Sequence, residues 1–311
     1  MLFVTKRKIF YALSIFLVLF SVCALFFWGL HFSIEFTGGA LIEVSYPGPR
    51  PELGQIEAGL KTLPLGETLV QPTGTDGYIV RTKDLNQEER QGLLKVLSLN
   101  GKSPLEEKRY NLVGPSIGTE LQRKAWVAIV LVMLAISLFL AYAFRKASGT
   151  VLTAMDTPIR SWHYGLITIL TLVHDVIIPV GIFSFLGTRF VDAQIDVLFV
   201  VALLTILGYS VHDTIVVFDR VRENLRKNQE LRLKKNFEDI VSESLSQTLV
   251  RSLNTSLTTF LATVALFFFG SIATKNFALM LGIGVVVGTY SSLCIAAPLI
   301  VTLDKLLKKR T

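Results

Sequence analysis

The sequence predicts a polytopic α-helical membrane protein with six transmembrane helices and an α+β domain inserted between the first and second helices. Two observations support this fold class. The 311 residues are 51% hydrophobic, with a mean hydropathy of +0.54, which is too apolar for an ordinary soluble protein. The apolar residues also gather in runs of about 20 or more, the length needed to cross the roughly 30 Å hydrocarbon core of a bilayer.

The first apolar run extends from Ile9 to Leu30 and follows the basic residues Lys6, Arg7 and Lys8. A cleaved signal peptide has a shorter apolar core and a cleavage site made of small residues, and neither is evident here. We therefore expect residues 1–30 to form a cytoplasmic amino end and an uncleaved first transmembrane helix.

Residues 31–124 differ in composition, because prolines, glycines and charges appear and no apolar window could cross a membrane. The periodicity predicts the order strand, helix, strand, strand, helix, strand, which fits a ferredoxin-like domain. No group of residues in it resembles a catalytic site, and its scattered charges are typical of a solvated face. The strands are predicted at Ala40–Tyr46, Thr68–Gln71, Tyr78–Thr82 and Lys108–Val113, with a hairpin turn at Gly74–Gly77, and the helices at Glu52–Leu63 and Asn86–Leu99, with Asn86 as amino cap.

Five more apolar runs lie between residues 125 and 303. A basic, amphipathic segment at 219–248 separates the fourth and fifth runs, and a basic tail occupies 304–311. Each run is long enough to span a bilayer. The predicted spans are Ala125–Phe144, Leu166–Leu186, Ile195–Phe218, Leu249–Gly270 and Phe277–Leu303.

The distribution of positive charge predicts the orientation of these helices. Lysine and arginine are enriched in short cytoplasmic loops. With the amino end in the cytoplasm, only Arg189 and Lys275 lie in the two short outer loops. Both termini are therefore predicted inside and the 31–124 domain outside, and the net charge of +7 serves topology rather than binding to nucleic acid. The basic residues on the inner side are Lys6, Arg7, Lys8, Arg145, Lys146, Arg160, Arg220, Arg222, Arg226, Lys227, Arg232, Lys234, Lys235, Lys305, Lys308, Lys309 and Arg310.

Asp213 is the candidate on which the prediction of function depends. It lies in the stretch Gly208–Asn224, inside the fourth span and, at about 1.5 Å per residue, roughly 10 Å from Arg220. An ionisable side chain at the centre of a membrane helix costs roughly 2.5–3.5 kcal/mol, so it is retained where it faces a protein interior or a wet cavity and acts there. The alternative is an interfacial residue near a helix end.

The fifth span opens with polar residues three and four positions apart, which places them on one face of a helix. We predict that this stripe faces Asp213, since one cytoplasmic connection joins the two helices. Movement of Arg251 or entry of water beside Asp213 would then load or release a proton. The alternative is a static buried ion pair that fixes helix register. The stripe consists of Gln247, Thr248, Arg251, Asn254, Thr255, Thr258 and Thr259.

Two His-Asp pairs lie on successive helices: His174 with Asp175, and His212 with Asp213. Adjacent residues point about 100° apart on a helix, so each pair offers one inward ligand at most and no metal site is expected. Asp175 is a candidate second member of the polar pathway, and His212, Asn254 and Thr255 are further supporting residues. The alternative for Asp175 is a hydrogen bond that holds two helices together.

Small residues recur in the sixth span, where Gly284, Gly288 and Ser292 stand four apart. Small residues at this spacing let helix backbones approach closely, so we predict helix packing rather than substrate contact. Cys23 and Cys294 both lie in apolar runs and form neither a disulfide framework nor a metal cluster.

Four motifs occur in order after the first span, before the second, in the fourth and at the start of the fifth. They resemble the motifs of SecF proteins in the SecD/SecF family, within the resistance-nodulation-division superfamily, and the resemblance covers nearly the whole chain. The matching residues are Phe36-Thr37-Gly38-Gly39; Val113-Gly114-Pro115 with Gly118, Glu120 and Leu121; Gly208-Tyr209-Ser210 with Asp213-Thr214-Ile215-Val216-Val217-Phe218-Asp219-Arg220; and Arg251-Ser252-Leu253-Asn254-Thr255-Ser256.

The resemblance implies half of an exporter in the bacterial inner membrane, with SecD as the other half. It also implies association with the SecYEG channel, with YajC as a further candidate partner, and use of the proton gradient to promote late polypeptide translocation. Protons are the coupling ion, and no cofactor is implied. Asp213 and Arg251 would be this chain's members of the proton pathway, SecD would supply a further acid, and the outer domain would handle the translocating polypeptide while lipid surrounds the helices.

Two departures from the family pattern stand out. Glu35 replaces the aspartate that usually precedes Phe-Thr-Gly-Gly, and the connection from Ala147 to Gly165 is longer than the family's short turn, so Trp162 and His163 receive no role from the resemblance.

Three other functions stay open. The first is a passive scaffold that stabilises the translocon or a SecD-like partner. The second is an intramembrane aspartyl protease using Asp175 and Asp213, although a Gly-x-Gly-Asp surround is missing. The third is a self-contained small-molecule exporter, although six spans make half of the usual twelve.

Overall fold

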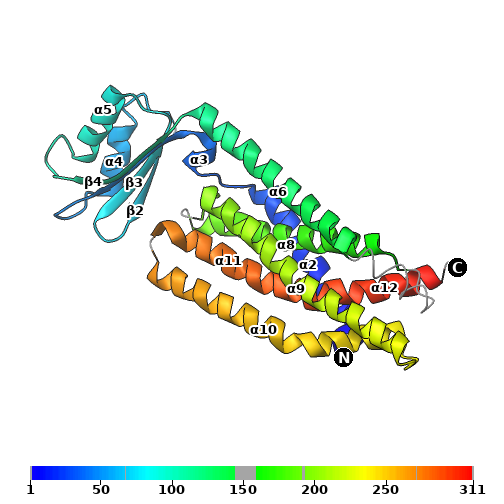
Figure 1. The fold of residues 1–311 in the computed structure, drawn as a ribbon. Helices are drawn as coiled ribbons and strands as arrows, with labels where there is room; N and C mark the ends of the chain where they lie inside the picture. Colours follow the sequence, from blue (N-terminus) through cyan, green and yellow to red (C-terminus); the bar gives the residue numbers. More distant parts are fainter. Residues whose placement is uncertain (1, 67, 144–158, 191–192, 271, 310–311) are drawn as a thin grey trace. The chain divides into compact units, whose positions relative to one another are not determined.

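The computed structural model describes residues 2–66, 68–143, 159–190, 193–270 and 272–309 (Figure 1). It divides into two compact units. One comprises His31–Trp126 together with Gln194–Val197, and the other contains the remaining parts of the chain.

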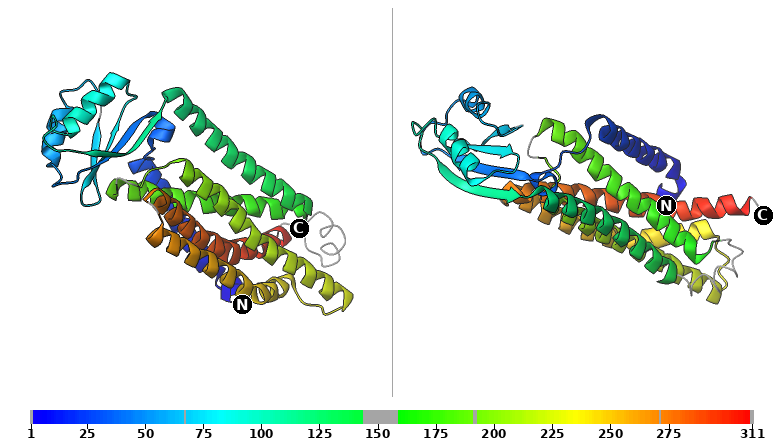
Figure 2. Two further views of the ribbon diagram at one scale, coloured as in Figure 1. Left: turned by 60° about the vertical axis from the view of Figure 1, so that its left-hand side comes forward. Right: turned by 90° about the horizontal axis from the view of Figure 1, so that it is seen from above.

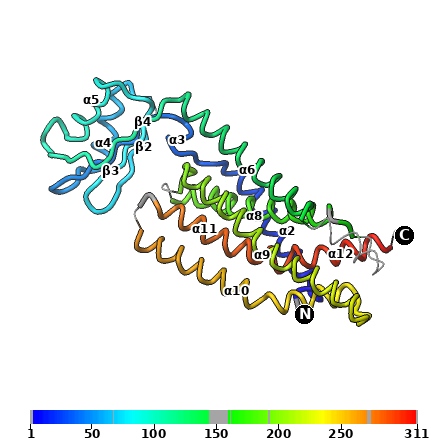
Figure 3. The backbone as a smooth tube through the Cα atoms, viewed as in Figure 1, coloured from blue at the N-terminus to red at the C-terminus, as the bar shows by residue number. Residues whose placement is uncertain are grey.

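The first of these units is built on a four-stranded antiparallel sheet. Its strands have the order β2-β3-β1-β4, and two helices are inserted in the chain order β1, α4, β2, β3, α5, β4 (Figure 3). β2 and β3 form the hairpin predicted at Gly74–Gly77, where Gly74 has a φ of +55°. The elements are β1 (Gly39–Ser45), α4 (Leu53–Leu60), β2 (Leu69–Thr73), β3 (Gly77–Thr82), α5 (Gln87–Leu97) and β4 (Glu106–Val113).

The core of this unit lies between the sheet and its two helices. Alternation along β1 turns Ala40, Ile42 and Val44 to the same face, and Ile56 of α4 and Leu93 of α5 pack against them, all fully buried. The predicted amino cap of α5 is confirmed, because Asn86 accepts a hydrogen bond from the Glu89 backbone N–H at 2.8 Å and donates its own N–H to the Glu89 carboxylate at 2.9 Å. The bond from the Asn86 N–H holds the pKa of Glu89 below its usual value.

The short helix α3 (Ile34–Thr37) joins this unit to the starts of two long helices. The first contact requires glycine, because Gly38 has a φ of +77° and an added Cβ would lie 2.7 Å from the Cα of Pro115, the first residue of α6. The second contact is a hydrogen bond of 2.8 Å from the backbone N–H of Val197, the first residue of α9, to the Glu35 carboxylate. A negative charge at a helix amino end is favourable. Glu35 therefore keeps a carboxylate at the start of the helix that carries Asp213.

Six segments among the described residues are long and apolar enough to cross a membrane, and each predicted span overlaps one of them to within two residues at its ends. α2 packs against α8, and α10 packs against α11 along most of its length (Figures 1 and 2). The helices are α2 (Arg7–Trp28), preceded by the short α1 (Leu2–Thr5), α6 (Pro115–Ala143), α8 (Ser161–Arg189), α9 (Val197–Glu230), α10 (Phe237–Phe269), and α11 (Ile272–Ser291), which continues through the π-helical turn η2 (Ser292–Ala296) into α12 (Ala297–Lys308).

The helices extend well beyond the predicted spans. Most of the basic segment 219–248 belongs to α9 and α10, which are separated only by residues 231–236. Hydropathy marks where a helix leaves the hydrocarbon and not where the helix ends, and this extension is held by polar contacts. Asn224 on α9 donates to the Ser244 hydroxyl of α10 at 2.9 Å, and Asn236 caps α10 by accepting from the Asp239 N–H at 2.9 Å.

The predicted connection at 147–165 lies partly outside the described residues, which resume at 159. α8 already begins at Ser161. Trp162 is exposed, whereas His163 is buried and its ring nitrogen accepts a hydrogen bond from the Arg160 backbone N–H at 2.7 Å. His163 therefore helps to start α8.

Candidate functional site

Asp213 lies on the buried face of α9 with 2% of its surface exposed. Its carboxylate accepts a hydrogen bond from the Ser256 hydroxyl of α10 at 3.4 Å, which is long for an O–H donor. Ser256 in turn shares a short hydrogen bond of 2.6 Å with Thr289 of α11. These three residues, the Asp213 cluster, connect three helices but leave the acid weakly bound.

Two neighbours of Asp213 add little to its stabilisation. His212 is exposed, and its Nδ1 lies 3.9 Å from the Asp213 carboxylate. Ser252, one turn before Ser256, is buried with its hydroxyl near the Asp213 carboxylate, although the two groups do not have the geometry of a full hydrogen bond. Within the described chain, no lysine or arginine lies within ion-pair distance of Asp213.

Asp175 on α8 is fully buried and lies in a second polar group, the Asp175 cluster, with His174, Ser210 and Ser291. His174 Nδ1 lies 2.9 Å from one carboxylate oxygen. The other oxygen accepts hydrogen bonds from the Ser291 hydroxyl at 2.8 Å and from the Ser210 hydroxyl. The acid could be predicted from the sequence, but the two serines could not, because serines are common on helices of every kind.

The two clusters meet along α9 and the π-helical turn η2. Ser210 lies one helical turn before Asp213 on α9. Ser292, the first residue of η2, donates to the Ser210 carbonyl at 3.1 Å and shares a hydrogen bond of 2.9 Å with the Thr214 hydroxyl. A π-helical turn inside an α-helix is frequent at functional sites. Hydrogen bonds thus connect the Thr214 hydroxyl, through the Ser292 hydroxyl, to the backbone carbonyl of Ser210, the residue whose own hydroxyl binds Asp175.

Most of the predicted polar stripe of α10 lies away from Asp213, and of its members Thr248 alone is buried. Arg251 and Asn254 are exposed and Thr255 is half-buried, whereas the side chains turned inward are Thr248, Ser252 and Ser256. Successive residues differ by about 100° around a helix, so a face defined by residues 248, 252 and 256 leaves Arg251 to one side. The four-residue spacing of these three hydroxyl groups is the signal that would have identified the inner face.

The small residues of the sixth span lie against α9. A Cβ on Gly284 would come within 2.1 Å of the Ile206 side chain, and one on Gly288 within 2.9 Å of the Ser210 Cβ. Ser292 makes the two hydrogen bonds described above. The lack of side chains at the two glycines lets α11 approach α9 closely enough for the Asp175 cluster to form.

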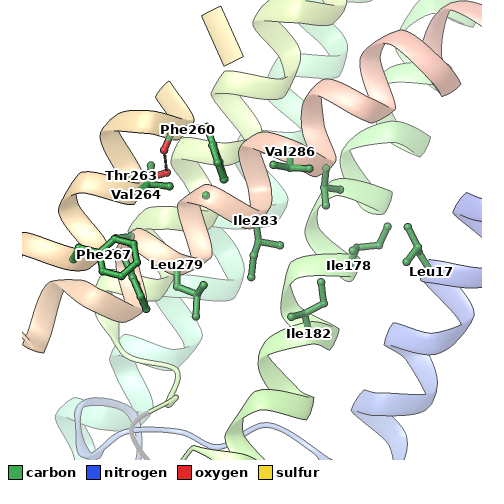
Figure 4. A pocket seen from close by; sticks show the side chains of 14 residues that line it. Leu17, Ile178, Ile182, Phe260, Thr263, Val264, Phe267, Leu279, Ile283 and Val286 are labelled. Atoms are coloured by element: carbon green, nitrogen blue, oxygen red, sulfur yellow. Dashed lines mark hydrogen bonds between the residues drawn. The ribbon is translucent and has the colours of Figure 1, made fainter. Parts of the chain in front are cut away.

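Two cavities border α10 and α11. One of about 440 Å³ is lined by apolar side chains of α2, α8, α10 and α11, such as Leu17, Ile178, Phe260 and Ile283, and offers no group for chemistry (Figure 4). The other, of about 430 Å³, reaches Ser256 and Thr289 of the Asp213 cluster. Open space therefore lies next to Ser256, whose hydroxyl contacts Asp213, and next to Thr289, whose hydroxyl contacts Ser256. The described residues contain no group of three His, Cys, Asp or Glu side chains placed to hold a metal ion.

Comparison with known proteins identifies the family to which this chain belongs. The family described as "Protein export membrane protein SecD/SecF, C-terminal" matches residues 95–156 and 158–306. The chain belongs to the SecD/SecF family. The resemblance of the four motifs to the SecD/SecF family is thereby confirmed.

Relatives match the chain over almost its full length. It is 39% identical to "Protein translocase subunit SecF" of Thermobaculum terrenum, over 95% of this chain and 92% of that protein. It is 36% identical to the protein of the same name from Magnetococcus marinus, over 97% of this chain and 91% of that one.

Two solved structures are similar as well. A crystal structure of SecDF, described as a translocon-associated membrane protein from Thermus thermophilus, matches with a TM-score of 0.80 and 30% identity over 98% of this chain. A crystal structure of SecDF in a super-membrane-facing form matches with a TM-score of 0.68. The chain spans 39% of the length of each of these SecDF chains.

Proposed function

We propose that this chain is a SecF-type subunit of a bacterial protein-export complex, and that Asp213 and Arg251 take part in a proton pathway that promotes late polypeptide translocation. Asp213 is the observation that carries the proposal. It is a buried acid whose hydrogen bond from Ser256 is long, beside a cavity that reaches Ser256 and Thr289. A carboxyl group with weak partners changes its charge when a cation or water approaches it.

The outer face of α10 supports a membrane partner. Arg251 and Asn254 are exposed on this face, and an arginine facing lipid inside a bilayer is costly. A neighbouring chain that covers the face would remove this cost and bring a further acid to the pathway. The partner in the proposal is SecD, since the similar SecDF chains join such a subunit to additional length in one polypeptide.

The remaining partners in the proposal are those that the resemblance to SecF proteins implies. The complex would act with the SecYEG channel on a translocating polypeptide, with YajC as a further candidate, in the lipid of the bacterial inner membrane. Protons serve as the coupling ion. The subunit acts without enzymatic activity, cofactor or nucleic acid.

In this proposal the sheet domain is a ferredoxin-like domain outside the cytoplasm, and both termini lie inside. The strand order β2-β3-β1-β4 and the chain order of its elements support this fold. The Glu35 carboxylate at the start of α9 provides a contact through which movement of the domain would reach the helix that carries Asp213.

The energy available is sufficient for such coupling. One elementary charge that crosses a potential of 100 mV gains about 2.3 kcal/mol. One proton per cycle is therefore enough to shift a two-state equilibrium by a factor of about 50, because each 1.4 kcal/mol is about tenfold.

The test is the substitution Asp213→Asn, which keeps the shape of the side chain and removes its charge. Export is measured in membrane vesicles with and without an imposed proton gradient, together with copurification of SecD. We expect Asp213→Asn and Arg251→Met each to abolish the gradient-dependent stimulation while assembly with SecD is retained. Glu230→Gln, at the exposed end of α9 where Glu230 pairs with Arg226, is the matched control and should behave as wild type.

A passive scaffold makes the opposite prediction for the same experiment. If this chain only stabilised its partners, removal of either charge would leave the stimulation at its wild-type level. That result in the Asp213→Asn protein would reject the proton pathway.

A further inference from the structure

His174 in the Asp175 cluster has one buried ring nitrogen, Nε2, for which the described residues provide no hydrogen-bond partner. Its Nδ1 lies 2.9 Å from the Asp175 carboxylate, whereas its Nε2 is buried and has no hydrogen-bond partner among the described residues. Buried polar atoms without partners are rare and each one calls for an explanation. The role proposed for Asp213 and Arg251 does not use this atom.

The surrounding contacts hold the imidazole in one orientation. Ser210 and Ser291 both donate to one oxygen of Asp175, which leaves the other oxygen turned to His174 Nδ1. In a neutral imidazole one nitrogen is a donor and the other an acceptor. With Nδ1–H donated to the carboxylate, Nε2 carries the lone pair that can accept a proton.

The charge of the pair favours uptake of one proton. A neutral His174 next to an ionised Asp175 leaves one uncompensated negative charge in a buried site. Among the described residues, His174 is the only basic side chain that forms an ion pair with Asp175. A proton on Nε2 brings the net charge to zero, which lowers the cost of burial. A carboxylate bonded to the opposite nitrogen also stabilises an imidazolium, as in the Asp-His pair of serine proteases.

The other titratable groups near the pair come from three helices. The ring of Tyr290 on α11 is stacked on the imidazole with 6.3 Å between centroids, Cys294 follows in η2, and Asp213 lies one turn beyond Ser210 on α9. Tyr290 hydrogen-bonds to the Phe10 carbonyl of α2 and to Ser14. None of these groups supplies a positive charge to the pair.

We propose that His174 is a second proton-binding residue of this chain, which takes up a proton at Nε2, and that Asp175 orients and stabilises it. Ser210 and Ser292 connect this position to Thr214, the neighbour of Asp213. A change of charge at His174 therefore reaches the Asp213 cluster through α9. The contribution of His174 to export rests on the proposed function, whereas proton uptake at Nε2 does not.

Solid-state nitrogen NMR of the full-length chain in lipid bilayers, with its four histidines labelled in the imidazole ring, tests the proposal. We expect one Nε2 signal, missing in His174→Asn, to change from the unprotonated to the protonated form as the pH of the sample is lowered from 8 to 5. The asparagine side chain in this variant is not titratable but keeps an amide donor toward Asp175. In Asp175→Asn the protonated fraction at the wild-type midpoint should fall at least tenfold.

Thr168→Val is the control, since the Thr168 hydroxyl on the same helix bonds to the Tyr164 carbonyl of that helix, and its titration should match wild type. The proposal is overturned if the His174 signal keeps one form throughout this pH range, or if Asp175→Asn leaves the protonated fraction unchanged. Because this readout needs no export, loss of stimulation in Asp213→Asn with an untitrated His174 would reject the second site alone. A titrating His174 with normal export by Asp213→Asn would reject only the proposed function.

Discussion

Asp175 and Asp213, two buried aspartates of the membrane helices, differ in what surrounds them. Asp175 and Asp213 are 0% and 2% exposed. The two carboxylate oxygens of Asp175 have three polar partners, which are His174, Ser210 and Ser291. Asp213 has a hydrogen bond of 3.4 Å from Ser256 and a histidine at 3.9 Å that is itself exposed. The two carboxylates are therefore almost equally buried, but hydrogen bonds stabilise Asp175 more strongly than Asp213.

This difference indicates which of the two sites the chain completes by itself. The Asp175 cluster joins α8, α9 and α11 and needs no other subunit. The Asp213 cluster lies next to α10, whose outer face carries the exposed Arg251 and Asn254. We interpret the first site as complete within this chain and the second as one that a partner completes.

The largest expected effect contrasts Asp175→Ala with Asp213→Ala. The first substitution removes the acceptor of the Ser210 and Ser291 hydroxyls, the two hydrogen bonds that join Asp175 to other helices. Hydrogen bonds between membrane helices contribute about 0.6 kcal/mol on average and up to about 1.7, so we expect a loss of roughly 1–3 kcal/mol in the isolated chain. Asp213→Ala removes one weak bond and should cost less than about 1 kcal/mol.

The measurement uses Cys294, which is buried in η2 and becomes reactive to a thiol probe when the helices separate, in a background where the exposed Cys23 is replaced by serine. The midpoint of thermal unfolding in detergent then reports on the membrane helices. Equal losses of stability for the two variants would contradict the contrast between the sites.

A smaller effect is expected when a methyl group is added beside only one of the two acids. In Gly288→Ala the new Cβ lies 2.9 Å from the Ser210 Cβ and pushes Ser210 away from Asp175. Overpacking of this kind costs about 1–3 kcal/mol. Gly282→Ala is the matched control on the same helix, because its nearest neighbour is the Thr263 hydroxyl at 3.1 Å and Gly282 borders a cavity.

We expect the Cys294 unfolding midpoint to fall in Gly288→Ala and to stay near wild type in Gly282→Ala. A second readout is the His174 signal described above, which should change in Gly288→Ala alone. If both glycine variants unfold alike, close packing at Gly288 is not what holds the Asp175 cluster together.

The architecture could be predicted well from sequence because the bilayer restricts the possibilities. A membrane requires long apolar helices, and each of the six predicted spans overlaps such a helix. The ends of α9 and α10 could not be predicted from hydropathy, since their extensions are polar and depend on contacts such as Asn224 with Ser244. Turn and cap residues such as Gly74 and Asn86 act locally, which is why the hairpin and the start of α5 could be predicted.

The candidate site could be predicted only in part. Asp213 and Asp175 stand out as charges in apolar runs. Their partners Ser256 and Ser291 do not stand out, because a hydroxyl group is satisfied by its own helix at almost any position. The sequence also does not show which face of α10 turns inward, since both the face with Arg251 and the face with Ser256 carry polar residues.

The smallest expected effect is at Arg251, and it distinguishes a site shared with a partner from one internal to the chain. Arg251 is exposed and makes no ion pair among the described residues, and substitutions at such positions usually change stability by less than about 0.5 kcal/mol. Arg251→Met should therefore leave the Cys294 unfolding midpoint of the isolated chain unchanged. In the complex with SecD the same substitution should lower the midpoint, since it would remove a contact that exists only there. A loss of stability in the isolated chain would mean that Arg251 turns inward to Asp213, and that the Asp213 cluster is complete without a partner.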